Sequence, residues 1–342
     1  MGAAKRVTIS DIARLAGVST GAVSFALNGR PGVSDSTRQR ILEIAKDLDW
    51  QPNSAARALV GGNSGVIGLV ISRPARTLGA EAFFADLIAG IQSGLSSRQA
   101  GLQMLLVRDV PAEIAAYRRW HNSRQVDGVL LLDPLLEDPR IPALNELGIP
   151  AVIVGSRPSP PGMPPTAWVD DIEAASTLFD YLAAIGHHDI AYVAGPAALE
   201  HTRLRTQVLR GLEAHGVRQE TIVTDYSPAH ATMISRQLLS RRQRPSVIVY
   251  DNDVMAVAGL RVAQEMGVAV PQDISIASFD DSVIAELMHP SITCLTRDTF
   301  ELGERAARLL LAQVDSPEPL DSLACPSPVL TVRESTIPPL KH

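Results

Sequence analysis

Residues 8–59 read TISDIARLAGVSTGAVSFALNGRPGVSDSTRQRILEIAKDLDWQPNSAARAL. Thr8 and Asp11 have the spacing of a capping box, which predicts the start of a helix. Gly17 is a typical residue for the end of that helix. The apolar residues that the helix is expected to bury are Ile12, Leu15 and Ala16.

Two further helical patterns follow. Ser19 predicts the start of a second helix that ends at Asn28-Gly29, and Ser34 predicts the start of a third. Their apolar positions, spaced for helices, are Ala22, Val23, Ala26, Leu27, Ile41, Ile44, Ala45 and Leu48. Only residues 17–19 separate the first two helices. This pattern is typical of a helix-turn-helix DNA-binding domain, although the same geometry also occurs as plain helical packing.

A fourth helical pattern runs over residues 54–60, after Pro52-Asn53. Seven residues are too few for a helix that is stable alone in water. We therefore expect this segment to become ordered only when a second copy of the chain or DNA packs against it. Leu59 near its end is then available as an apolar wedge, unless it docks on the following domain.

The charge of the chain is divided unevenly. The net charge is −6, but residues 1–62 hold eight basic and five acidic side chains and the remainder carries −9. This favours a basic head that approaches phosphate and an acidic body that does not. The start of the chain lacks the apolar stretch of a signal peptide, and no later run is long enough to span a membrane, so we expect a cytoplasmic protein.

From residue 66 onward, apolar strand patterns alternate with helical patterns, which predicts an α/β body with parallel sheets covered on both faces. The strands are expected at 66–71, 102–107, 128–132, 151–154, 190–194, 247–250, 274–279 and 292–295. So many units favour two similar lobes, with the Pro-rich stretch 157–165 near the middle. Ligands bind such sheets beyond the carboxyl ends of the strands, so a cleft between the lobes is the expected site.

Motifs that would indicate catalysis are missing. The chain has no P-loop, no Gly-x-Ser-x-Gly elbow and no His-Glu-x-x-His, which predicts no enzyme activity and no cofactor. Cys294 and Cys325 provide neither a disulfide framework nor a zinc site. His187-His188 is expected to cap a helix end. The acidic groups at 251–253 and 280–281 follow strands, where capping or hydroxyl binding is favoured over a metal ion.

The sequence resembles the lac repressor/galactose repressor (LacI/GalR) family of bacterial transcription regulators over nearly its whole length. The motifs that carry the resemblance are VTISDIARLAGVS, AVSFALN, VSDSTRQRI and WQPNSAARAL in the head, and FFADLIAGI, VDGVLLL, IGHHDIAYVAG, DNDVMA and GVAVPQDISIASFDD in the body. The resemblance implies an N-terminal all-α helix-turn-helix domain and a periplasmic-binding-protein-like body of two doubly wound parallel-sheet lobes. The implied boundaries are 1–51 for the DNA-binding domain, 52–63 for a hinge helix, 64–167 plus 296–327 for one lobe, and 168–295 plus 328–342 for the other.

In such a regulator a homodimer binds a near-palindromic DNA operator, and the second helix of each copy enters the major groove. By position, the residues expected to read bases are Thr20, Gly21 and Phe25, and those expected to contact phosphates are Thr8, Ser19, Ser24, Asn28, Ser34 and Thr37. Ala56 and Leu59 match minor-groove residues. Phe25 departs from the family, because many relatives have arginine there. Phenylalanine can touch a thymine methyl but cannot bind guanine with two hydrogen bonds.

The resemblance also implies a small polar, sugar-like effector, a carbohydrate, bound between the lobes. The matching positions are Phe83 or Phe84 together with Asp133, Tyr226, Asn252 and Asp280, as aromatic platforms and hydroxyl acceptors. Val208 stands where many relatives have an arginine, which weakens the sugar assignment. Arg203 or Arg205 is expected to replace that arginine only if the loop is rebuilt.

The leading hypothesis is a transcription regulator that acts as a repressor. The effector controls its affinity for the operator. The body alone would also fit a solute-binding protein, and a sugar-modifying α/β enzyme is the third hypothesis. The basic head disfavours the solute-binding protein, and the missing catalytic motifs disfavour the enzyme.

Overall fold

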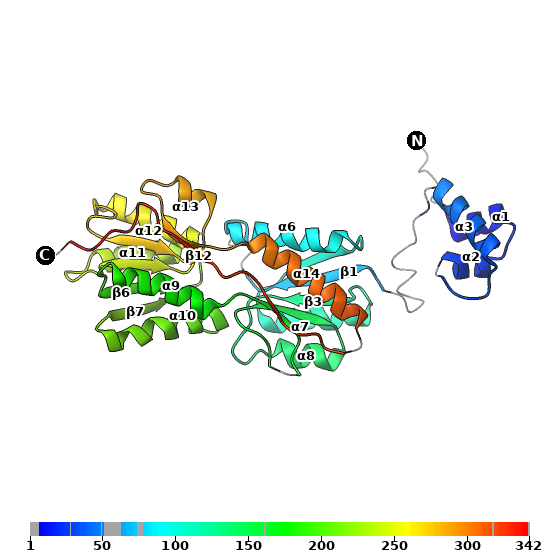
Figure 1. Ribbon diagram of the computed structural model, residues 1–342, viewed down its shortest axis with the longest axis horizontal. Coiled ribbons are helices and arrows are strands. Elements are labelled where there is room, and N and C mark those ends of the chain that lie inside the picture. The colour runs from blue at the N-terminus through cyan, green and yellow to red at the C-terminus, as the bar shows by residue number, and fades with distance from the viewer. Residues whose placement is uncertain are drawn as a thin grey trace. The chain divides into compact units, whose positions relative to one another are not determined.

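The computed structural model describes residues 7–27, 29–48, 50, 63–73, 78–160, 162–316 and 318–340 (Figure 1). The chain divides into two compact units, residues 1–63 and residues 64–342. The helix predicted over residues 54–60 lies outside the described residues, as do Asn28, Ala56 and Leu59. Within the described ranges, no helix is long and apolar enough to cross a membrane.

The described helices of the first unit follow the predicted pattern, and they are α1 (Ile9–Ala16), α2 (Thr20–Leu27) and α3 (Asp35–Asp47). Thr8 and Asp11 form the predicted capping box, and Gly17 ends α1 with a left-handed φ of 63°. The side chain of Ser34 caps α3 by accepting a hydrogen bond from the backbone N–H of Thr37. The local signals for helix ends therefore operate as expected.

The core of this unit differs from the prediction at one residue. Ile12, Val23 and Ile41 are fully buried, but Leu15 is 56% exposed and the prediction that it is buried is wrong. Leu15 is one residue, about 100° of helix rotation, away from the buried Ala16. The contacts of α1 with α2 and α3 fall on the side that carries Ile12 and Ala16, so Leu15 faces solvent.

Two arginines of α3 hold the ends of the other helices. The guanidinium of Arg38 donates to the carbonyl oxygens of Ala26 (3.0 Å) and Arg30 (2.7 Å) at the end of α2. Arg40 donates to the carbonyl oxygen of Ala16 (2.6 Å) at the end of α1. Cations at helix C-termini satisfy free carbonyls and oppose the helix dipole. These two charges therefore stabilise the three-helix arrangement.

The second unit contains two sheets that form two lobes (Figure 1). The first sheet has the order β11-β5-β4-β3-β1-β2, and every pairing in it is parallel. Its strands are β1 (Val66–Ile71), β2 (Gly101–Leu106), β3 (Gly128–Leu131), β4 (Ala151–Gly155), β5 (Thr166–Trp168) and β11 (Leu323–Ala324).

The second sheet has the order β12-β10-β9-β8-β6-β7, in which only β12 runs antiparallel to its neighbour. Its strands are β6 (Asp189–Ala194), β7 (Arg218–Val223), β8 (Val247–Tyr250), β9 (Ser275–Ser278), β10 (Thr293–Thr296) and β12 (Val329–Thr331). The chain passes between the lobes after β5, after β10 and after β11. Each lobe therefore contains segments that are distant in the sequence.

Helices cover both faces of each sheet, as the sequence predicts for buried parallel strands. The helices of the first lobe are α6 (Ala82–Ser96), α7 (Val110–Asn122), α8 (Arg140–Leu147) and α14 (Thr299–Asp315). Those of the second lobe are α9 (Asp171–Ala184), α10 (Glu200–Gly211) with the 3-10 turn η1 (Leu212–His215), α11 (Pro228–Leu239), α12 (Asp253–Glu265) and α13 (Val283–Leu287). Each lobe has an apolar cluster on either side of its sheet.

Glycines allow α6 and α14 to pack with their backbones in contact. A Cβ atom at Gly90 would lie 1.9 Å from the carbonyl oxygen of Phe300, and one at Gly303 would lie 2.3 Å from that of Leu87. The helix that returns from the second lobe is thereby fixed on the first. The predicted fold class, a helix-turn-helix head and two doubly wound parallel-sheet lobes, is confirmed.

Candidate functional site

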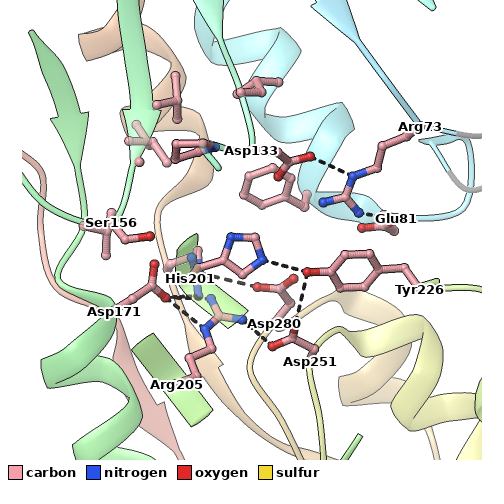
Figure 2. Close-up of a pocket in the computed structure, with 18 residues that line it drawn as sticks. Arg73, Glu81, Asp133, Ser156, Asp171, His201, Arg205, Tyr226, Asp251 and Asp280 are labelled. Carbon is pink, nitrogen blue, oxygen red and sulfur yellow. Dashed lines mark hydrogen bonds and ion pairs between the residues drawn. The ribbon is translucent and has the colours of Figure 1, made fainter. Parts of the chain in front are cut away.

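A pocket lies between the two lobes, where the loops after the strands of both sheets meet (Figure 2). It occupies about 660 Å³ when the open space at its mouth is counted. Its polar lining residues are Arg73, Glu81, Asp133, Ser156, Asp171, His201, Arg205, Tyr226, Asp251, Asp280 and Arg297. This is the strand-end cleft that the sequence predicts.

The predicted effector residues divide into two groups. Those that line the pocket are Phe83, Asp133, Arg205, Tyr226 and Asp280. Phe84, Asn252 and Arg203 do not. Phe84 is buried in the core of the first lobe and packs edge-to-face against Phe83, with ring centroids 5.3 Å apart. Asn252 caps α12, because its side-chain oxygen accepts a hydrogen bond from the backbone N–H of Met255 (2.8 Å).

The two arginines suggested for the cleft lie on different faces of α10. Arg203 is directed away from the pocket, so its assignment to the cleft is wrong. Arg205 reaches the pocket from a regular turn of α10 and needs no rebuilt loop. Val208 packs against the core of the second lobe and leaves the pocket to Arg205. A buried guanidinium is therefore present despite the departure at Val208.

Arg205 is held by two carboxylates of the second lobe, one at the start of α9 and one in the loop after β8 (Figure 2). It donates to Asp171 (2.6 Å from Nη2) and to Asp251 (2.7 Å from Nη1), and it lies over the ring of Phe279 at 4.4 Å. Burial is the largest single effect and would raise the pKa of both carboxyl groups, but Arg205 together with the neighbouring charges and hydrogen bonds outweighs it, so the pKa of each is lowered. The three groups are therefore charged at neutral pH.

Tyr226 joins this cluster to the other side of the pocket. Its hydroxyl donates to Asp251 (3.0 Å) and accepts a hydrogen bond from Nε2 of His201 (2.7 Å). Burial, together with the charge of Arg205, lowers the pKa of His201, so its imidazole is neutral at pH 7. The guanidinium of Arg73, from the first lobe, lies 4.2 Å from the centre of the Tyr226 ring. Tyr226 is therefore a direct contact between the lobes.

Arg73, Asp133 and Glu81 form the ionisable cluster of the first lobe. Arg73 donates to Asp133 (2.8 Å), and its Nη1 lies 3.6 Å from the nearest oxygen of Glu81. Burial raises the pKa of Glu81 to about 8, although the charge of Arg73 opposes the rise. Glu81 is therefore mostly protonated at neutral pH. Among the described residues, neither Nη1 of Arg73 nor Oε1 of Glu81 has a hydrogen-bond partner.

Two pocket residues adopt an unfavourable backbone conformation. Asp133 has a φ of 51° and Tyr226 a φ of 65°, in the left-handed region that residues other than glycine rarely adopt. The loop of Asp133 is fixed from behind by Arg140, which donates to the carbonyl oxygen of Asp133 (2.8 Å). Such strain is often retained where it directs a side chain toward a ligand.

The lobes also touch beside the pocket. The backbone N–H of Glu200 donates to the carbonyl oxygen of Pro134 (2.9 Å), and Leu135 forms an isolated β-bridge with Leu199. The carboxylate of Glu200 pairs with Arg157 at 2.7 Å. These contacts join the loop after β3 to the start of α10. A change in the angle between the lobes must therefore break them.

Sequence reasoning missed several pocket residues. It marked the acidic residues Asp133, Asp251 and Asp280 that follow strands, but it did not name Arg73, Glu81, His201 or Arg297. Arg297 lies on the crossover from β10 to α14, and its Nε is 3.5 Å from Asp280. The crossover itself was a usable signal, because a segment that connects two lobes passes the cleft between them.

In the first unit, the predicted base-reading residues Thr20, Gly21 and Phe25 are exposed on α2. The ring of Phe25 lies beside Gly32, where a Cβ atom would be 3.2 Å from it. Of the predicted phosphate-contacting residues, Thr8, Ser19 and Ser34 precede the three helices and cap them. Ser24 and Thr37 are half-buried.

The two units match known families. Residues 8–53 match the model of bacterial regulatory proteins of the lacI family, and residues 179–336 match a periplasmic binding protein-like domain. The HTH-type transcriptional regulator CelR of Thermobifida fusca is 33% identical over 327 residues, which cover 92% of this chain and 95% of CelR. The repressor PurR of Erwinia tasmaniensis is 29% identical over 316 residues, 90% of this chain and 91% of PurR.

Solved structures agree with this match. The complex of CelR with cellobiose superposes with a TM-score of 0.71 at 31% identity, over 97% of this chain and all of CelR. The lac repressor dimer bound to operator and an anti-inducer gives a TM-score of 0.80 at 25% identity, over 97% of this chain and all of the repressor chain. A helix-turn-helix head followed by a two-lobed body defines a DNA-binding transcription regulator. The chain belongs to the lacI family of bacterial regulatory proteins.

Proposed function

We propose that this regulator is a repressor whose effector is an uncharged, polyhydroxylated molecule, a carbohydrate, bound in the pocket between the lobes. The observation that carries the proposal is the lining itself, which alternates guanidinium donors with carboxylate acceptors beside the rings of Phe83 and Tyr226. Sugars present hydroxyls that both donate and accept, and apolar C–H faces that pack on rings. CelR, a relative, is solved with cellobiose.

Arg73 and Glu81 are the groups we assign to first contact with the hydroxyls. Each has a polar atom without a hydrogen-bond partner among the described residues, whereas Arg205 is already bound by two carboxylates. A buried polar atom without a partner carries a free-energy cost that a ligand hydroxyl removes. Arg205 then positions the second lobe, and its loss would also leave Asp171 and Asp251 unpaired.

The test is calorimetry of the full-length protein with cellobiose, other disaccharides, monosaccharides and nucleosides. We expect a carbohydrate to bind, and Arg73→Gln to weaken it about tenfold or more, because a charged donor is lost. Arg98→Gln is the control, since Arg98 pairs with Asp315 on the surface of the same lobe. Binding of a nucleoside but of no carbohydrate would refute the proposal.

We propose that the effector acts by changing the angle between the lobes. A ligand that contacts Arg73 on one lobe and Asp280 on the other favours the arrangement in which both are within reach. The contacts of Glu200 with Pro134 and Arg157 belong to one such arrangement. Residues 52–63 join the body to the head, and their pairing on DNA is the property that we expect the angle to control.

We further propose that the chain acts as a homodimer on a near-palindromic operator, in which α2 of each copy presents Thr20, Gly21 and Phe25 to the major groove. The relative solved on operator is a dimer. The short helix α13 has an apolar face for a second copy: Val283, Ile284 and Leu287 are 70%, 57% and 78% exposed.

Sedimentation of Leu287→Glu tests the dimer. We expect the wild type to sediment as a dimer and this variant as a monomer at micromolar concentration, because a charge in an apolar interface has no partner. Val223→Glu places the same charge on an exposed valine of edge strand β7 and should leave the dimer intact. A monomeric wild type, or a dimeric Leu287→Glu variant, would contradict the proposed interface.

A further inference from the structure

A second pocket lies on the outer face of the second lobe, between α10 and the edge strand β7. It occupies about 910 Å³ when the space at its mouth is counted. Its floor includes Ala197, Val223 and the side chains of threonines 202, 206 and 221. We call it the α10–β7 groove. The pocket between the lobes is lined by other residues, so the two are separate sites.

The groove carries two arginines that have no ion pair among the described contacts. Arg203 and Arg210 are exposed and both line it. The acidic groups nearby are already engaged, since Glu200 pairs with Arg157 and Glu213 accepts a hydrogen bond from Gln219. This leaves a local excess of positive charge on a body whose net charge is −9.

The spacing of the arginines suits a single anionic group. They are seven residues apart, which separates their backbones by roughly 10 Å along the helix axis and places them on the same side of it. Thr206 and Gln207 lie between them and also line the groove. The arginine side chains are long enough for both guanidinium groups to reach one phosphate placed above these residues. A planar guanidinium binds the oxygens of a phosphate well.

The groove also contains an unsatisfied buried group. The residue Thr202 is 2% exposed, and its hydroxyl has no hydrogen-bond partner among the described residues. By contrast, the hydroxyl of Thr206, one turn further on, donates to the carbonyl oxygen of Thr202 (2.8 Å). Native buried hydroxyls are usually paired, so Thr202 indicates that a polar ligand completes this floor.

We propose that the α10–β7 groove is a second ligand site and that it binds a small phosphorylated metabolite. The phosphate lies between Arg203 and Arg210, and the body of the molecule lies against Ala197, Val223 and the threonine side chains. The site also bears on the cleft. His201 and Arg205 line the cleft from another face of the same helix, so a ligand that fixes α10 acts on both.

The test uses the full-length protein, glucose 6-phosphate as the probe, and calorimetry at low ionic strength. Glucose and sodium chloride, each alone, control for the sugar and for the salt. We expect glucose 6-phosphate to bind, and we expect Arg203→Gln/Arg210→Gln to raise its dissociation constant about tenfold or more. Arg242→Gln/Arg244→Gln removes the same charge from exposed positions of the same lobe and should leave the constant unchanged.

Three results would overturn the proposal: no binding of the probe, equal weakening by the two double variants, or loss of binding in Arg73→Gln but not in Arg203→Gln/Arg210→Gln. The last result would place the phosphate in the cleft. Because the substituted arginines are exposed, circular dichroism should show both double variants folded. The proposed effector role of the cleft is tested separately with uncharged sugars, so either idea can fail alone.

Discussion

Gly195 leaves room for the ring that joins the two lobes. A Cβ atom at this position would lie 2.0 Å from the ring of Tyr226, which the structure places between Arg73, His201 and Asp251. We therefore expect Gly195→Ala to displace Tyr226 and to weaken effector binding about tenfold or more, as loss of a buried charged hydrogen bond does. Calorimetry with the effector measures this.

Gly211→Ala is the control for that prediction. Nothing lies within 4 Å of a Cβ at Gly211, and this residue ends the helix that carries Arg205. Effector affinity should therefore stay at the wild-type value. An unchanged affinity in Gly195→Ala would mean that the position of Tyr226 is not needed for binding.

His187 predicts a pH dependence of stability. It was expected to cap a helix end, but it is fully buried, with Nδ1 2.9 Å from the hydroxyl of Ser246 and Nε2 3.1 Å from the carbonyl oxygen of Ile337. Burial lowers its pKa to about 4. The folded protein thus holds the neutral imidazole, whose stabilising effect is complete above about pH 6.5 and is lost as the pH falls toward 4.

The free energy of unfolding should therefore fall by up to about 1.4 kcal/mol per pH unit across that window through this group. His187→Gln should reduce the slope, and His188→Gln, which changes an exposed neighbour, should not. Denaturant unfolding at pH 4.5, 5.5 and 6.5 gives the comparison. An identical slope in wild type and His187→Gln would assign the acid sensitivity to other groups.

The cleft shows what residue patterns can and cannot predict. Asp133, Asp251 and Asp280 follow apolar strands directly, so their place at the strand ends was readable. The assignment of Arg205 to the cleft was ambiguous, because the position at which many relatives have arginine is Val208 in this chain. Only the rotation of α10 about its axis decides which side chain enters the cleft. Glu81 gave no signal, since its pKa depends on burial by residues distant in the sequence.

At the scale of helices, the arginines of α3 yield a testable difference. Arg38 donates to the carbonyls of Phe25 and Ala26 in the last turn of α2 and to that of Arg30 beyond it. Arg14 is exposed and, among the described residues, pairs with Asp11 three residues earlier. We expect Arg38→Ala to speed hydrogen exchange in α2 about tenfold, as loss of roughly 1–2 kcal/mol from a helix terminus would.

Arg14→Ala should change the exchange of α1 little, because an exposed pair contributes about 0–1 kcal/mol. Exchange followed by mass spectrometry on the full-length protein reports both helices together. Similar protection of α2 in the wild type and in Arg38→Ala would show that packing alone holds this helix.

The prediction of strands and helices failed where the segment itself has few apolar residues or is very short. The strands β1 and β8 were predicted at their observed bounds because their runs are apolar and buried. The strand β7 was missed, since it reads RQETIV and lies at a sheet edge. The strand β5 and the helix α13 are too short for a periodic signal. Tertiary pairing, which one sequence does not display, defines these elements.

At the scale of the molecule, the uneven charge predicts how operator binding depends on salt. The head should release counterions from phosphate, so the logarithm of the association constant should fall linearly with that of the salt concentration. Arg38 and Arg40 are occupied by helix carbonyls, so we expect a slope smaller than all the basic residues of the head would give. Fluorescence anisotropy with an operator from 50 to 200 mM salt measures it, and a flat response would exclude phosphate as the main contact.

The passages of the chain between the lobes set the order in which this protein can fold. The first sheet needs β11 and the support of α14, and the second needs β12, all of which lie beyond residue 298. A chain emerging from the ribosome can complete its three-helix head early, but both lobes wait for nearly the last residues. During synthesis, the head is therefore complete more than two hundred residues before the body that is to control it.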